Sequence, residues 1–132
     1  MNVYVFGNID TPQDNKAIQT AHKLASSMKD IDFIYVNPNE DLPFSEEKVV
    51  ILDTVEGIDE PKLLDLNKSD KIILPPRYSV HDFDLGFQLR YLKKLGKLKK
   101  IQVIGIPIRK GFSYLKVQSI LRKLVAQDIQ GS

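Results

Sequence analysis

The chain has 132 residues, of which 42% are hydrophobic, and its formal net charge is +2. This length suits one compact domain with its own core, so we expect a single domain over residues 1–132. The sequence contains no cysteine, which excludes disulfides, thiolate-bound metals and a cysteine nucleophile. Any metal site must therefore use histidine, carboxylates, carbonyls or water.

The sequence also argues against membrane and nucleic-acid partners. No window approaches the roughly 18 apolar residues of a spanning helix, and the N-terminus has no basic leader, so we expect a soluble, cytoplasmic protein. The basic run LKKLGKLKK, residues 92–100, has no interleaved aromatic residue and is typical of the solvated end of a helix. We therefore expect neither a membrane nor a nucleic acid as a partner.

Short apolar runs and helical stripes alternate in the first half of the chain. The runs at 3–6, 31–36 and 48–53 predict strands. Between the first two, apolar residues recur at the three- and four-residue spacing of an amphipathic helix: Ala17, Ile18, Ala21, Leu24, Ala25 and Met28. The segment PKLLDL, residues 61–66, fits either a short helix or an edge strand.

The same alternation continues to the end of the chain. Strands are expected at 70–74 and 100–106, with a helix of about 84–96 between them and a last helix after Gly111. The strands are continuous apolar runs, so helices should cover both faces of the sheet. We therefore expect a three-layer α/β/α domain with a mostly parallel sheet of about five strands.

Polar residues follow three predicted strands at the edge where open parallel sheets bind ligands. Asp14 follows the first strand, Asp53 closes the third, and His81 follows the fourth. Two carboxylates and one imidazole suit a divalent ion such as zinc, nickel or iron, and they could equally act as acid, base and orienting group without metal. Each also has an ordinary structural use: Asp14 as a helix N-cap, Asp53 as a turn residue and His81 as a cap or solvated loop residue.

Two segments of the chain resemble the first two motifs of the hydrogenase maturation proteases. The segment VFGNIDTPQDN, residues 5–15, resembles the first motif, in which a strand ends in Gly-Asn seven positions before a metal-binding acid. Here Gly7 stands seven positions before Asp14. The segment VVILDTVEG, residues 49–57, resembles the second motif, an aspartate that closes an apolar strand, with Asp53 in that place.

A third segment completes the resemblance. The segment YSVHDFDLGFQLRYLKKLGKLKKIQVIGIP, residues 78–107, resembles the third motif, a Ser/Thr-x-His stretch that opens a helix and is followed by an IGI strand, and His81 matches its histidine. The three motifs occur in the order of the family and span almost the whole chain, with most similarity to the small archaeal-type members. The family's first motif usually ends in two acids and a glycine, whereas this chain has Gln13, Asp14 and Asn15.

The resemblance implies an α/β/α endopeptidase that removes the C-terminal extension of a [NiFe] hydrogenase large-subunit precursor after nickel insertion. It implies that Asp14, Asp53 and His81 form the catalytic site and contact nickel carried by the precursor, which acts as the recognition element. Gly7 and Asn8 would contact the substrate peptide. Zinc or another divalent ion could occupy the same site in vitro.

Three alternatives stay open at the level of sequence. The metal could activate water or the scissile carbonyl, or Asp14 or Asp53 could act as general base while nickel only positions the substrate. The chain could also be a catalytically silent module that binds metal or a subunit. A receiver-like signalling domain is the third alternative, since it too is a small doubly wound sheet with aspartates at strand ends.

Overall fold

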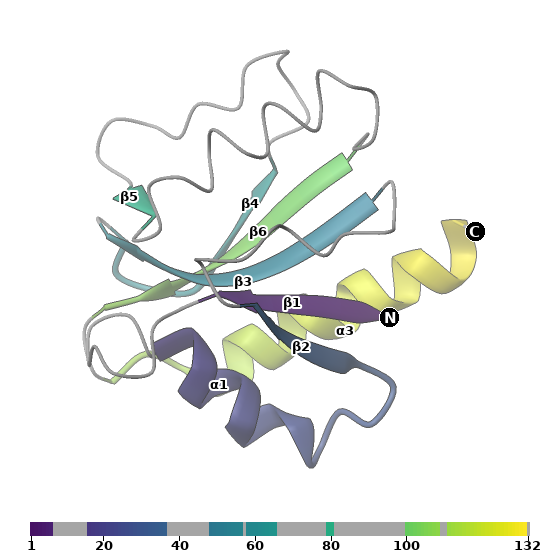
Figure 1. Cartoon of the computed structure of the whole chain (residues 1–132), viewed down its shortest axis with the longest axis horizontal. Coiled ribbons are helices and arrows are strands. Elements are labelled where there is room, and N and C mark those ends of the chain that lie inside the picture. Colours follow the sequence, from purple (N-terminus) through teal and green to yellow (C-terminus); the bar gives the residue numbers. More distant parts are fainter. Residues whose placement is uncertain are drawn as a thin grey trace.

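The computed structural model describes residues 1–6, 16–36, 48–56, 58–65, 79–80, 100–108 and 111–131. They form an α/β fold, a mostly parallel sheet with two helices (Figure 1). In chain order the elements are β1 (Asn2–Phe6), α1 (Lys16–Ala25), β2 (Asp32–Val36), β3 (Lys48–Glu56), β4 (Lys62–Asp65), β5 (Ser79–Val80), β6 (Lys100–Pro107) and α3 (Tyr114–Gly131).

The strand order reverses its direction near the centre of the sheet. Its order is β2-β1-β3-β6-β4, and the first four of these strands run parallel. The chain therefore starts at β1, crosses to β2 on one side and returns to β3 on the other, so the direction of winding reverses between β1 and β3. β4 pairs with β6 antiparallel, and the two-residue β5 pairs antiparallel with β3.

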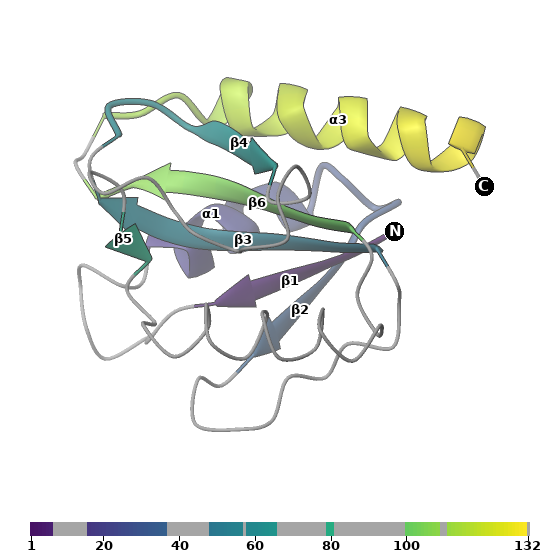
Figure 2. The same cartoon turned by 90° about the horizontal axis from the view of Figure 1, so that it is seen from above.

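Helices α1 and α3 lie side by side on one face of the sheet (Figures 1 and 2). Successive residues of β1 point to opposite faces, as expected for a strand buried on both sides. The cluster on the helix side contains Val3, Val5, Ala17, Ala21, Leu24, Leu52, Ile104, Ile106, Val117, Leu121 and Leu124, among others. The cluster on the opposite face contains Tyr4, Phe6, Val36, Val49, Ile51, Ile101 and Val103.

Local polar contacts define where the helices begin and end. Ser113 is the N-cap of α3, because its Oγ accepts the amide of Lys116 at 3.3 Å. Gly111, two residues earlier, has φ of 89°, a left-handed conformation that glycine adopts without steric cost. At the end of α1, the amides of Ser27 and Met28 both donate to the carbonyl of Leu24 and tighten the last turn.

The structure confirms most of the predicted elements that it describes. The strands expected at 3–6, 31–36, 48–53 and 100–106 are present, and so are the first predicted helix and the last one after Gly111. The ambiguous segment 61–66 contains the antiparallel strand β4 rather than a helix. The strand expected at 70–74 and the helix expected at 84–96 fall on residues outside the described part of the chain, so the three-layer α/β/α arrangement stays a prediction.

Candidate functional site

Asp53 lies inside a strand and is not a turn residue. β3 continues three residues beyond it to Glu56, so the prediction that the strand ends at Asp53 was wrong. Register pairs with β6 continue through this region, from Asp53↔Gly105 to Val55↔Pro107, and these pairs extend the strand. The side chain is 1% exposed, and its Oδ1 accepts the backbone N–H of Thr54 at 2.8 Å.

Asp53 occupies the position in β3 where its neighbour β1 ends. The register pairs between β1 and β3 run to Val5↔Leu52, and β1 itself ends at Phe6. Open α/β sheets bind ligands at the carboxyl ends of the strands that flank the reversal of winding, here β1 and β3. The candidate carboxylate therefore lies at the point of the fold where a ligand is expected.

A second strand meets β3 just beyond Asp53. Val80 of β5 pairs with Val55, and Ser79 pairs with Glu56 (Figure 2). Because β6 already pairs with Val55 on one side, β5 must lie on the side of β1, beyond its carboxyl end. Asp53 and Thr54 thus fill the interval of β3 between the end of β1 and the start of its pairing with β5.

The two residues of this interval face opposite sides of the sheet. Asp53 lies on the same face as Ile51, away from α1 and α3, and is paired with Gly105 of β6. Thr54 lies on the helix face, paired with Ile106, and is fully buried. Among the described residues, the Thr54 hydroxyl has no hydrogen-bond partner. Sequence reasoning singled out neither Thr54 nor Gly105, because both depend on pairing with distant residues.

The other predicted site residues lie outside the described residues: Gly7, Asn8, Asp14 and His81. Two of them directly follow described strands in the sequence, since β1 ends one residue before Gly7 and β5 ends one residue before His81. In the described part of the chain, no three histidine, aspartate or glutamate side chains gather to hold a metal. A metal at Asp53 would need further donors, and Asp14 and His81 are of the right chemical kind.

The segment after β3 is tied to α3 by an ion pair. Nζ of Lys116 lies 2.6 Å from Oε1 of Glu60, and both side chains are largely exposed. The hydrogen bond and charge of Lys116, with a smaller contribution from Lys62, hold the pKa of Glu60 below its ordinary value of 4.5. Ile58 and Pro61 of the same segment are buried. The segment is therefore held both by the ion pair to α3 and by the packing of these two side chains.

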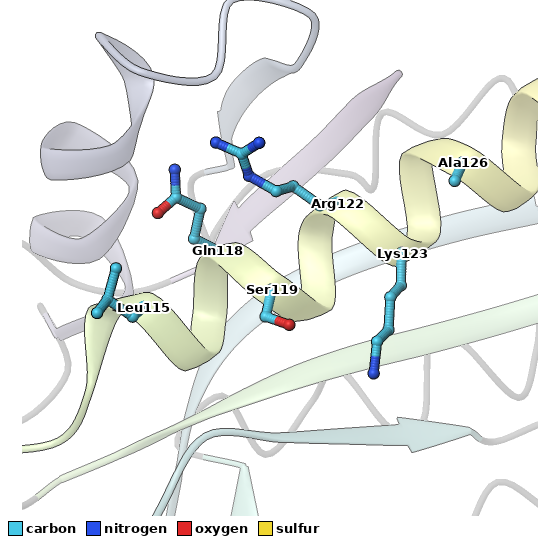
Figure 3. Close-up of a pocket in the computed structure, with 6 residues that line it drawn as sticks. All are labelled: Leu115, Gln118, Ser119, Arg122, Lys123 and Ala126. Carbon is cyan, nitrogen blue, oxygen red and sulfur yellow. The ribbon is translucent and has the colours of Figure 1, made fainter.

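A shallow groove of about 410 Å³ lies on the exposed side of α3 (Figure 3). This helix covers the sheet face opposite to the one that carries Asp53. Its lining residues all come from that helix: Leu115, Gln118, Ser119, Arg122, Lys123 and Ala126. The two charged residues are both cationic, and none of the predicted site residues lines it. The groove is therefore a separate surface feature and not part of the candidate site.

Comparison with known proteins identifies a related fold but no family. No family model and no curated protein matches this chain. A solved structure described as "The crystal structure of an uncharacterized protein from Wolinella succinogenes" matches with a TM-score of 0.58 and 16% sequence identity, covering 96% of each chain. At this identity the match shows the fold alone. Within the described residues, no helix is long and apolar enough to span a membrane.

Proposed function

We propose that this chain is a cytoplasmic endopeptidase of the hydrogenase maturation type. Its substrate would be the large-subunit precursor of a [NiFe] hydrogenase, from which it removes the C-terminal extension once nickel has been inserted. The proposal rests on the motif resemblance and on one structural observation. Before Asp53, β3 pairs with β1, the strand that precedes Gly7. After Asp53, on the same edge, β3 pairs with β5, the strand that precedes His81.

The pairing supports the proposal because the three motifs are far apart in the sequence. The described strands that lead into the first and third motifs both pair with the strand that carries the second. Nickel enters as cargo of the precursor, and the protein would recognise it through Asp53, Asp14 and His81. When bound, such an ion supplies Lewis-acid polarisation of an oxygen atom.

The local structure of Asp53 suits a carboxylate that must keep one orientation. The Thr54 amide donates a hydrogen bond to Oδ1 of Asp53 from a strand that is fixed by β6, and this bond restrains the orientation of the carboxyl group. A preoriented carboxylate loses little freedom on meeting its ligand. The same orientation would serve if Asp53 acted as general base on a water molecule.

The test is the rate at which a nickel-loaded precursor is cleaved by wild-type protein and by Asp53→Asn. Asparagine keeps an oxygen that can accept the Thr54 amide but cannot carry the negative charge, so we expect kcat/KM to fall at least about 100-fold. Asp32→Asn, an exposed change in β2, is the matched control and should retain full activity. Full activity of Asp53→Asn would refute the site, and precursor binding without cleavage by wild type would favour a silent binding module.

A further inference from the structure

A row of three residues crosses the sheet at the level of the candidate carboxylate. Asp53 of β3 pairs with Gly105 of β6, and Gly105 pairs on its other side with Lys62 of β4. Residues in register on neighbouring strands point to the same face. Glycine therefore leaves a gap between the side chains of Asp53 and Lys62 on the face that carries Asp53.

The gap over Gly105 is filled from a different part of the chain. A Cβ placed on Gly105 would lie 3.1 Å from Cδ1 of Ile58 and 3.1 Å from Cγ2 of Val55. Carbon atoms in contact prefer about 3.5–4.0 Å, so a methyl group here would displace its neighbours by a few tenths of an ångström. Ile58 is 6% exposed and Val55 is fully buried, which leaves little room for such a shift.

The residues that fill this gap are connected to Asp53 through the backbone. Val55 follows Asp53 by two positions in β3 and lies on the same face, and Ile58 lies two residues beyond the end of the strand. The ion pair between Glu60 and Lys116 holds the same segment from the side of α3. Displacing Ile58 or Val55 would therefore move the part of β3 that sets the hydrogen bond between Asp53 and Thr54.

We infer that Gly105 and Ile58 are positioning residues for the Asp53 carboxylate. Gly105 provides the space that Ile58 occupies. The packed Ile58 side chain fixes the end of β3, so that Oδ1 of Asp53 keeps accepting the hydrogen bond from the Thr54 amide. The catalytic consequence rests on the proposed function, whereas the geometric consequence does not. The partnership can be tested as a steric pair, because removing Cδ1 of Ile58 should relieve one of the two close contacts that a methyl group on Gly105 would make.

The first readout needs no substrate. In the ¹H–¹⁵N spectrum, the Thr54 amide reports its hydrogen bond to the carboxylate, and we expect Gly105→Ala to shift this resonance. Ile58→Val removes Cδ1 but leaves the contact with Cγ2 of Val55, so Gly105→Ala/Ile58→Val should return the resonance part of the way towards the wild-type position. Gly111→Ala is the matched control, because a positive φ makes it destabilising while no atom of the described residues lies within 4 Å of the added methyl. It should leave the Thr54 amide in place.

The second readout is cleavage of the nickel-loaded precursor. We expect Gly105→Ala to lower kcat about 10-fold or more with little change in KM. The double variant should recover part of that loss, and Gly111→Ala should keep wild-type kcat. A normal Thr54 resonance in Gly105→Ala, or no recovery in the double variant, would overturn the inference. If wild type fails to cleave, the proposed function fails, and the spectrum alone then decides whether Gly105 and Ile58 position Asp53.

Discussion

We expect Thr54→Val to raise the free energy of unfolding, because it removes a fully buried hydroxyl with no hydrogen-bond partner among the described residues. Burying such a group without a partner costs about 1–3 kcal/mol in protein mutational data. The methyl that replaces it adds up to roughly 0.8 kcal/mol of apolar burial, part of which is lost to crowding beside Ile106. The net gain should be about 1–2 kcal/mol, or a rise in Tm of roughly 3–8 °C.

The assay is urea unfolding followed by circular dichroism, with the midpoint and the m-value both fitted. Thr20→Val is the matched control: Thr20 is also fully buried, but its Oγ1 donates to the carbonyl of Lys16 at 2.7 Å. That change should lower stability by about 1 kcal/mol, since it removes a made hydrogen bond. If Thr54→Val were as destabilising as Thr20→Val, the hydroxyl would have a partner and the reasoning would be refuted.

Two further predictions concern α3. Ser113→Ala removes the N-cap and should lower the free energy of unfolding by about 1 kcal/mol in urea, whereas Ser113→Asp should keep the cap. The lowered pKa of Glu60 means that its ion pair stabilises the fold above pH 4.5, and that this contribution is lost as the pH falls through the lower folded-state pKa. Lys116→Met should therefore reduce the loss of stability on acidification below about pH 4.5, measured as the urea midpoint against pH. An unchanged acid dependence in that variant would contradict the pairing.

Apolar periodicity was sufficient to predict the elements whose burial is set by their own residues. The stripe of α1 appears as Ala17, Ala21 and Leu24 in the core, and the stripe of α3 as Val117, Leu121 and Leu124. The runs of β1 and β6 are buried on both faces, as their continuous apolar character indicates. These elements need no information beyond the spacing of their own side chains.

The features that sequence reasoning missed depend on pairing between distant segments. β3 extends past Asp53 because β6 and β5 provide partners for Val55, and no local signal marks that pairing. β4 is a strand because it pairs antiparallel with β6. The local sequence of residues 61–66 fits a short helix equally well, so this pairing decides between the two. The contact of Ile58 over Gly105 likewise follows only from the fold.

For the candidate site as well, the sequence predicted the position of Asp53 but not its contacts. Its place at the end of an apolar run selected Asp53, and the structure places it beside the end of β1, where the strand order reverses and open α/β sheets bind ligands. Its burial and its bond to the Thr54 amide were not predicted, because a polar residue after an apolar run is usually a turn residue. The placement of Asp14 and His81 stays a prediction.

The most direct test of the proposed activity is the intact mass of a [NiFe] hydrogenase large-subunit precursor incubated with the protein. The precursor is prepared with and without nickel, and each form is treated with wild type and with Asp53→Asn. We expect wild type to shorten only the nickel-loaded form, by the mass of its C-terminal extension, and Asp53→Asn to leave both forms intact. An unshortened nickel-loaded precursor, or equal shortening by Asp53→Asn, would contradict the account.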